Sequence, residues 1–194
     1  TVGHPIPGVC ARIVHPETGI SLPPGEEGLL LVKGANRMVG YLNQPEKTSA
    51  VFRNGWYVTG DVARIDEDGF IQITDRLSRF SKIGGEMVPH ARIEEAIHRV
   101  IPESDCVVTA VSDDRKGERL VVLYTGNPLE PSTLRDLLKK TDLPPLWIPK
   151  PDDFYRVPAI PMAAIGKVDL RRVKAMATEL SADSAERPAG DTES

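Results

Sequence analysis

Apolar and polar positions along the first 74 residues alternate in short runs, which is the pattern of β-strands. The runs are residues 8–15 (GVCARIVH), residues 26–34 (EEGLLLVKG) and the two halves of residues 56–74 (WYVTGDVARIDEDGFIQIT). Asp68-Gly69, between the last two runs, is a hairpin signal. One short helix candidate, residues 44–52, interrupts the series. The pattern predicts a small antiparallel, barrel-like sheet over residues 1–74.

From residue 75 onward, helix-like and strand-like segments alternate. Four apolar residues recur at helical spacing after Pro89, namely Ile93, Ala96, Ile97 and Val100. The other expected elements are strands at residues 106–112, 119–126 and 153–157, and helices at residues 132–141 and 169–180. Ser132 is a plausible N-cap for the first of these two helices. The series predicts a compact α+β domain with a short sheet and about three helices.

The change of pattern near Asp75 indicates a domain boundary. We expect a β-rich domain at residues 1–74 and an α+β domain at residues 75–180. Residues 75–85 (DRLSRFSKIGG) are then interpreted as a linker entering the second domain. Residues 181–194 are polar and lack periodicity, so we expect them to be disordered.

Composition and charge narrow the classes of protein. The 194 residues carry a formal net charge of −4, which argues against a nucleic-acid-binding surface. Cys10 and Cys106 match no disulfide or metal framework, and a reducing, cytoplasmic compartment is the simplest interpretation. The histidines show no metal-ligand spacing, so we expect no metal site. No apolar run approaches the roughly 18 residues of a membrane span, so any contact with a membrane is expected to come from segments outside this chain.

Thr59-Gly60-Asp61 and Arg76 are candidates for nucleotide binding. A carboxylate held at a turn between strands can accept hydrogen bonds from both hydroxyl groups of a ribose. The forked guanidinium of Arg76 could donate to a ribose or a phosphate. The structural alternatives are a turn aspartate that caps its own backbone and a surface arginine in a salt bridge. Taken alone, neither residue decides between these interpretations.

Two glycine-containing segments are further candidates. Gly84 and Gly85, followed by Glu86, would let a ligand chain lie against the backbone, because glycine has no Cβ atom. The alternative is a loop with a capping glutamate. Gly166-Lys167 is not a phosphate-binding Walker loop, because that motif requires Ser or Thr after the lysine and Val168 follows here. Lys167 is either a solvated loop lysine or a mobile positive charge for phosphate or carboxylate oxygens.

The order of these segments resembles the C-terminal part of the adenylate-forming enzymes, the superfamily of acyl-CoA synthetases, luciferases and peptide-synthetase adenylation domains. The resemblance is carried by GLLLVKGANRMVGYLNQPEKTSAVFRNGWYVTGD, DGFIQITDRLSRFSKIGGEMV, IEEAI and PMAAIGKVDLRRV, and it extends to about Leu180. The segments RFSKIGGEMV and LPPLWIPKPDDFYRVPAIPMAAIGK further resemble the bifunctional bacterial acyl-[acyl-carrier-protein] synthetase / 2-acylglycerophosphoethanolamine acyltransferases.

The resemblance implies a role for each candidate. Asp61 is expected to bind the ribose hydroxyls of ATP and AMP, with Arg76 assisting. Lys167 is expected to be the catalytic lysine, which reaches the acyl carboxylate and the α-phosphate. Ser78 stands at the family's hinge position, where Asp or Lys is usual, and a small polar residue can absorb a backbone rotation. The segment Gly84-Gly85-Glu86 is expected to line the path of a phosphopantetheine arm.

The implied function is that of an AMP-forming ligase. Such an enzyme activates a fatty acid with ATP and Mg²⁺ as an acyl-adenylate, and then transfers the acyl group to the phosphopantetheine thiol of acyl carrier protein or of coenzyme A. Residues 1–74 would complete the large adenylation domain and residues 75–180 would form its mobile lid. The family's phosphate loop and acyl pocket lie upstream of these motifs. We therefore expect a fragment that is inactive and binds no cofactor tightly by itself, placed in the cytoplasm or at the inner face of the cytoplasmic membrane. A non-catalytic module that docks a carrier protein remains the alternative.

Overall fold

The computed structural model describes residues 1–126 and 129–186, and the chain divides into two compact units, residues 1–78 and 79–194. The division falls after Ser78, slightly later than the boundary expected before Asp75. No helix in the described part of the chain is both long enough and apolar enough to cross a membrane.

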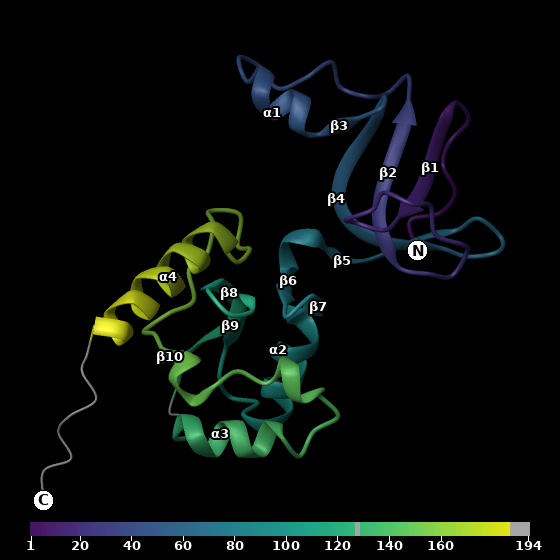
Figure 1. Ribbon diagram of the computed structural model, residues 1–194. Coiled ribbons are helices and arrows are strands. Elements are labelled where there is room, and N and C mark those ends of the chain that lie inside the picture. The colour runs from purple at the N-terminus through teal and green to yellow at the C-terminus, as the bar shows by residue number, and fades with distance from the viewer. Residues whose placement is uncertain (127–128, 187–194) are drawn as a thin grey trace, which may run out of the picture. The chain divides into compact units, whose positions relative to one another are not determined.

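Unit 1 is a curled antiparallel sheet, as its alternating sequence predicts (Figure 1). Its elements are β1 (Val9–Val14), β2 (Gly28–Gly34), α1 (Pro45–Ala50), β3 (Phe52–Arg53), β4 (Trp56–Ile65) and β5 (Ile71–Arg76). The strands follow the order β1-β2-β4-β3, and β5 also pairs with β4. Val2 and Gly3 exchange backbone hydrogen bonds with Ile71 on β5, which continues the curl. β4 is therefore the strand on which the unit is assembled.

Unit 2 is a mixed sheet with helices on both faces. Its elements are β6 (Phe80–Ile83), β7 (Glu86–Pro89), α2 (His90–Val100), β8 (Cys106–Asp113), β9 (Gly117–Tyr124), α3 (Pro131–Leu138), β10 (Phe154–Arg156) and α4 (Leu170–Glu186). Short 3₁₀ turns lie at Leu77–Arg79, Pro145–Trp147 and Pro151–Asp153. The strand order is β10-β9-β6-β7, with β8 on the other side of β9. The α+β class and the three helices expected for this region are confirmed.

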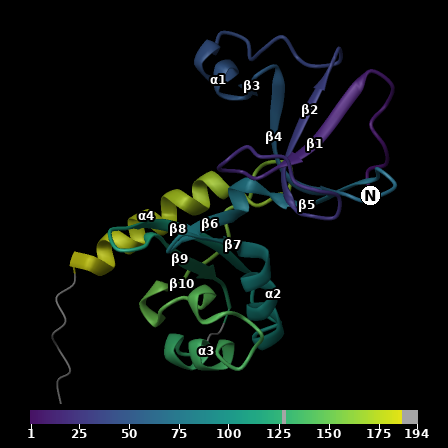
Figure 2. The same cartoon turned by 45° about the vertical axis from the view of Figure 1, so that its right-hand side comes forward.

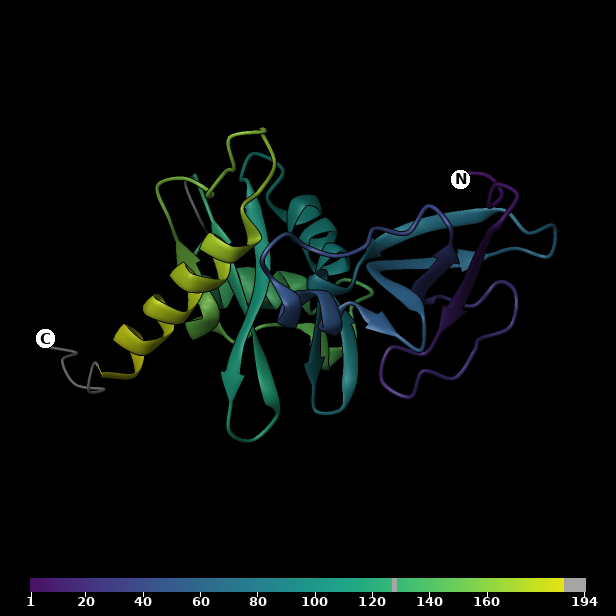
Figure 3. The ribbon, with the colours of Figure 1, turned by 90° about the horizontal axis from the view of Figure 1, so that it is seen from above.

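The two faces of the unit 2 sheet are buried under different helices. Val108 and Val122 belong to the cluster that includes residues of α2 and α3, whereas Val107 and Val121 pack with α4. Figure 2 shows α4 on the side of the sheet opposite α3, and Figure 3 shows α4 lying along the β8–β9 hairpin. Because successive side chains of a strand point to opposite faces, a strand covered on both sides must be apolar at nearly every position. This explains the continuous apolar runs in β8 and β9.

Three expectations for unit 2 are wrong in detail. Residues 75–85 are not a free linker, because they form the end of β5, a 3₁₀ turn, β6 and the turn that follows it. Ser132 does not cap α3; the helix begins at Pro131 with Glu130 before it, and the fixed φ of proline suits that first position. The helix α4 continues to Glu186, where disorder was expected from residue 181. The Ser184 hydroxyl donates to the Leu180 carbonyl at 2.9 Å within this extension. The rest of the expected tail, residues 187–194, lies outside the described residues.

A carboxylate on α2 joins the first residue of unit 2 to the sheet. The Arg79 guanidinium forms an ion pair with one oxygen of Glu94. The other oxygen of Glu94 accepts the backbone N–H of Val108, on β8, at 2.9 Å. Both side chains of the ion pair are largely shielded from solvent, which strengthens it relative to a surface pair. Glu94 thereby fixes α2 to β8 and to the segment that leads into β6.

A buried hydrogen bond joins β6 to the first residue of α2. Ser81 Oγ and His90 Nε2 are 2.6 Å apart, and the two residues are 3% and 4% exposed. Burial, together with the positive charges of Arg79 and Lys174, lowers the pKa of His90 to about 4. The folded protein therefore holds this imidazole in its neutral form.

We predict that acid destabilises the protein through His90. An unfolded histidine titrates near pH 6.5, so between that value and pH 4 the unfolded state binds more protons than the folded state. The contribution of neutral His90 to the free energy of unfolding is fully present above pH 6.5. It decreases as the pH falls, by on the order of 2 kcal/mol at pH 5. Denaturant unfolding at several pH values measures this free energy. The free energy of unfolding of His90→Gln should fall less over this interval than that of the wild type, whereas His98→Gln, at an exposed position, should follow the wild type. If the free energy of unfolding fell equally with pH in all three proteins, His90 would not be the cause of the acid destabilisation.

Candidate functional site

The strand β4 carries a bulge where its pairing with β2 changes register. Leu29 is opposite Val62 and Leu31 is opposite Val58, so the single residue Leu30 faces three residues of β4, namely Thr59, Gly60 and Asp61. Gly60 has φ of +77°, and a Cβ atom built there meets no other atom within 4 Å. The glycine is required by backbone conformation, not by crowding. A bulge of this kind redirects the side chains that follow it.

Side-chain hydrogen bonds replace the strand ladder within the bulge. The Thr59 hydroxyl donates to the Leu30 carbonyl at 2.8 Å and accepts the Asp61 N–H at 3.0 Å. Leu30 is buried, so its carbonyl oxygen needs a partner inside the protein. From the sequence, Thr59 was only the first residue of the Thr59-Gly60-Asp61 segment, with no role of its own. Its position two residues before Asp61, where a hydroxyl can form a turn with the following backbone, was the available signal.

Asp61 and Arg76, the two candidates for nucleotide binding, are direct neighbours. They are paired residues of β4 and β5, and Arg76 Nε lies 2.7 Å from Asp61 Oδ1. The aspartate side chain is 16% exposed and the arginine side chain is 63% exposed. The ion pair engages Nε, so the terminal nitrogens of Arg76 carry further N–H donors for a ligand. Arg76 therefore does form a salt bridge, which was its structural alternative, and the partner of the Asp61 carboxylate in that bridge is the arginine side chain.

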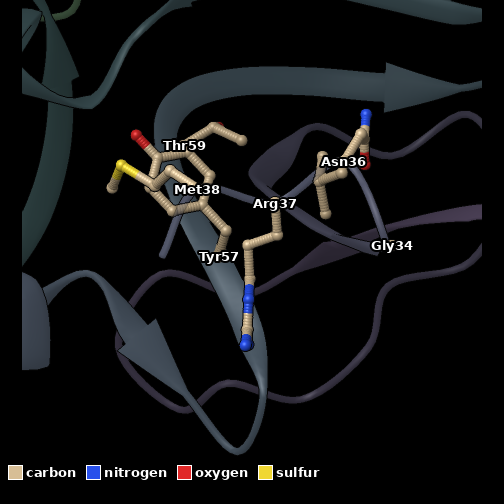
Figure 4. A pocket seen from close by; sticks show the side chains of 7 residues that line it. Gly34, Asn36, Arg37, Met38, Tyr57 and Thr59 are labelled. Carbon is tan, nitrogen blue, oxygen red and sulfur yellow. The ribbon is translucent and has the colours of Figure 1, made fainter. Parts of the chain in front are cut away.

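A pocket of about 380 Å³ opens beside the same segment of β4 (Figure 4). The residues that line it are Val32, Gly34, Asn36, Arg37, Met38, Tyr57 and Thr59. A hydrogen bond with the side chain of Tyr41, followed by burial and the negative charge of Asp61, raises the pKa of Tyr57. The volume is within the range of small-molecule sites. The alternation of polar and apolar residues could not predict this pocket. Its lining residues come from β4, β2 and the loop after β2, which are brought together only by folding.

Gly84 and Gly85 form the turn of the β6–β7 hairpin. Ile83 and Glu86 are the paired residues that flank them. The two glycines have φ of +58° and +93°, and positive φ at both central residues is the requirement of a type I′ turn. Cβ atoms built at either glycine meet no atom within 4 Å. The turn requires positive φ at both positions, which explains why two adjacent glycines are present. The space above both glycines is open.

The hairpin is anchored to other parts of unit 2. The Gly84 N–H donates to the Lys116 carbonyl at 3.0 Å, and the Lys82 N–H donates to Glu118 Oε2 at 2.8 Å. Glu86 Oε1 accepts the indole N–H of Trp147 at 2.8 Å. Sequence reasoning missed Trp147, which is far from Glu86 in the chain. These bonds hold the glycine turn in one place against the loop between β8 and β9.

Lys167 lies on an exposed loop before α4. Gly166, with φ of +75°, donates to the Ala163 carbonyl at 2.9 Å, and Ala163 N–H donates to the Lys167 carbonyl at 2.7 Å. The isolated bridge between Met162 and Val168 closes this tight loop. A carboxylate oxygen of Asp169 accepts the N–H groups of Arg171 and Arg172, which caps α4. The loop is therefore fixed at its base while the side chain of Lys167 points into solvent.

The candidates fall into separate groups. Asp61 and Arg76 form a pair in unit 1, whereas the glycine turn and Lys167 belong to unit 2. Ser78 lies in the 3₁₀ turn between β5 and β6 and is the last residue of unit 1. Within the described residues, no three His, Cys, Asp or Glu side chains gather in a way that could hold a metal ion.

Unit 2 has a sheet between two layers of helices, and this fold matches that of the AMP-binding enzyme C-terminal domain. Residues 92–167 match the AMP-binding enzyme C-terminal domain, and this part of the chain belongs to that domain family. Over most of its length, the chain is also similar to acyl-CoA ligases.

The curated relatives are ligases of several kinds. A long-chain-fatty-acid–CoA ligase of Bacillus subtilis is 36% identical over 182 residues, which is 92% of this chain and 32% of the relative. The fatty acid–[acyl-carrier-protein] ligase ScoC of Streptomyces coeruleorubidus is 36% identical over 135 residues, which is 70% of this chain and 26% of the relative. The chain therefore spans about a third or less of the length of these relatives.

Solved structures show the same fold. ATP-bound MatB from Rhodopseudomonas palustris is 30% identical, with a TM-score of 0.76 over 92% of this chain and 36% of MatB. The O-succinylbenzoate coenzyme A synthetase of Bacillus subtilis in complex with AMP is 28% identical, with a TM-score of 0.67 over 89% of this chain and 34% of that enzyme. The expected fold class is confirmed.

We predict that the glycine turn tolerates asparagine but not a β-branched residue at its first position. Gly84→Val forces a bulky side chain into positive φ and should lower the free energy of unfolding by roughly 1–2 kcal/mol. Gly84→Asn should leave it nearly unchanged, because Asn-Gly is a favoured type I′ sequence. Denaturant unfolding compares the two variants. Equal losses for valine and asparagine would show that crowding, and not φ, restricts this position.

Proposed function

We propose that this chain is part of an ATP-dependent, AMP-forming ligase that activates a fatty acid and transfers the acyl group to a phosphopantetheine thiol. The observation that carries the proposal is the Asp61–Arg76 pair at the bulge of β4, in a chain similar to ATP-bound MatB. An acidic side chain with an adjacent cation suits a ribose, because its carboxylate accepts from hydroxyl groups and the guanidinium donates to oxygens. Mg²⁺ would enter with the phosphates of ATP.

Lys167 would supply positive charge in the first half-reaction. The fatty acid carboxylate attacks the α-phosphate of ATP, a bond forms between carboxylate oxygen and phosphorus, and pyrophosphate leaves. Negative charge accumulates on the phosphate oxygens as the two anions meet, and an ammonium group on a flexible stem can offset it. The exposed loop that carries Lys167 suits a side chain that must enter a site formed by other parts of the polypeptide.

The glycine turn would serve the second half-reaction. The thiol attacks the acyl carbonyl, AMP leaves and a thioester forms. Open space above Gly84 and Gly85 suits the passage of a thin pantetheine arm. A hollow of about 140 Å³ lies beside the turn. Its charged lining residues are Arg115, Lys116, Arg119 and Lys150 together with Asp113 and Asp153, so basic groups outnumber acidic ones even though Arg119 is paired with Asp153. Such a lining would favour the phosphate that both thiol donors carry. Rotation at Ser78 between the half-reactions completes the proposal.

Acyl carrier protein is the thiol donor that we favour, with coenzyme A as the alternative. The relatives include a fatty acid–[acyl-carrier-protein] ligase and a long-chain-fatty-acid–CoA ligase, so they support both. The narrower resemblance of RFSKIGGEMV to the bifunctional bacterial enzymes favours the carrier protein and adds an acyltransferase domain elsewhere in the longer polypeptide. Thioester formation assayed with each acceptor in turn decides between them.

We predict that Lys167→Ala, in the longer ligase, slows adenylation by roughly a hundredfold or more, the scale for loss of one preorganised electrostatic group. Pyrophosphate exchange measures this step. Transfer from supplied acyl-adenylate to the thiol should be nearly unaffected. Lys140→Ala, at an exposed position of the same unit, serves as the control and should leave both steps unchanged.

A substitution at the glycine turn should give the opposite result. Gly85→Val should slow the transfer step and spare pyrophosphate exchange, because its side chain would occupy the proposed path of the arm. If Lys167→Ala damaged both half-reactions equally, the assignment of the lysine to adenylation alone would be wrong.

We also predict that the 194-residue chain by itself binds ATP weakly and forms no acyl-adenylate. Most affinity for a nucleotide comes from backbone amides and lysines that contact its phosphates, and the chain has no Walker loop. Titration calorimetry of the chain with ATP measures the affinity. Tight binding would contradict the division of roles between this chain and the remainder of the ligase, and would favour an independent nucleotide-binding module.

A further inference from the structure

We propose that Thr59 is a positioning residue for the nucleotide ribose, acting through Asp61. This inference rests on the proposed function, in which the carboxylate of Asp61 accepts the ribose hydroxyls. The Thr59 hydroxyl is the group that fixes where the Asp61 backbone lies within the bulge.

The geometry of the bulge gives this hydroxyl a structural role. Regular pairing with β2 stops at Val58 and resumes at Val62, so the three residues between them have no register with β2, and Asp61 pairs only with Arg76 of β5. Within this gap, the Thr59 hydroxyl accepts a hydrogen bond from the Asp61 N–H and donates one to the buried Leu30 carbonyl. Gly60 separates the two residues and adopts positive φ, so its backbone alone restricts the direction of Asp61 only weakly.

Asp61 is consequently held from two sides. On the side of β2 the backbone is fixed through Thr59, and on the side of β5 Asp61 is paired with Arg76, whose Nε lies 2.7 Å from the carboxylate. A carboxylate that must accept from two adjacent hydroxyl groups requires correct placement of both oxygens, because hydrogen bonds weaken steeply when the distance or angle is wrong. Loss of the backbone anchor should therefore affect recognition of the ribose hydroxyls more than it affects other parts of the nucleotide.

The test uses variants of the longer ligase and compares ATP with 2′-deoxy-ATP and 3′-deoxy-ATP in pyrophosphate exchange. Thr59→Val keeps the shape of the side chain and removes the hydroxyl, whereas Thr59→Ser keeps the hydroxyl. In Thr59→Val, kcat/KM for ATP should fall about tenfold, the scale for loss of an important hydrogen bond, while the values for the deoxy nucleotides change little. Thr59→Ser should restore most of the preference for ATP.

Thr141→Val is the matched control for folding. The Thr141 hydroxyl also donates to a carbonyl, that of Leu138, and also accepts the N–H two residues later, that of Leu143, but it belongs to unit 2. Thermal unfolding of both valine variants shows whether they lose similar stability. Thr141→Val should leave the preference for ATP unchanged.

Asp61→Ala separates failure of this inference from failure of the proposed function. Loss of the preference in Asp61→Ala and in Thr59→Val, with recovery in Thr59→Ser, supports the inference. An effect of Asp61→Ala together with an unchanged preference in Thr59→Val overturns the role of Thr59 alone. An equal loss in Thr59→Ser and Thr59→Val, or in Thr141→Val, overturns it as well. An unchanged preference in Asp61→Ala overturns the ribose assignment itself, and the role of Thr59 with it.

Discussion

The hydroxyl group of Thr59 holds β4 to β2 at the one place where their regular pairing breaks down. Its bonds to the Leu30 carbonyl and the Asp61 N–H let the strand carry extra residues without leaving buried polar groups unsatisfied. Asp61 leaves the bulge paired with Arg76 of β5, and pairing with β2 resumes at the next residue, Val62. The β4–β5 pairing has a register shift of its own, between Val62 and Ala63. Such irregularities increase the local twist of a sheet.

Unit 2 solves a different problem, because its sheet is covered on both faces. The apolar runs of β8 and β9 supply side chains to α2 and α3 on one face and to α4 on the other. Chemistry-bearing groups are therefore confined to the loops, where backbone hydrogen bonds and caps fix their positions. The glycine turn is bonded to the β8–β9 loop, and the Lys167 loop is closed just before the N-terminus of α4. These exposed groups therefore stand on rigid supports.

The strands and helices with strong periodicity could be predicted from the sequence, as β8, β9, α2 and the hairpin at Asp68-Gly69 show. The β6–β7 hairpin could not, because each of its strands has only four residues and its Gly-Gly turn also suits a flexible loop. Asp61 and Arg76 were chosen separately, and only the cross-strand register reveals that they are neighbours. The bond between Glu86 and Trp147 and the role of Thr59 depend on contacts that local patterns do not encode.

The carboxylate of Glu94 has a consequence for the behaviour of the protein at high concentration. Among the described residues, β8 pairs only with β9, so its outer side offers backbone groups to a strand of another molecule. Glu94 already accepts the N–H of Val108, the third residue of β8, and its negative charge is balanced by Arg79. An incoming strand would have to displace a shielded, charge-assisted hydrogen bond before it could extend the sheet. The interaction that fixes α2 therefore also protects this sheet against intermolecular β-strand addition and the aggregation that follows from it.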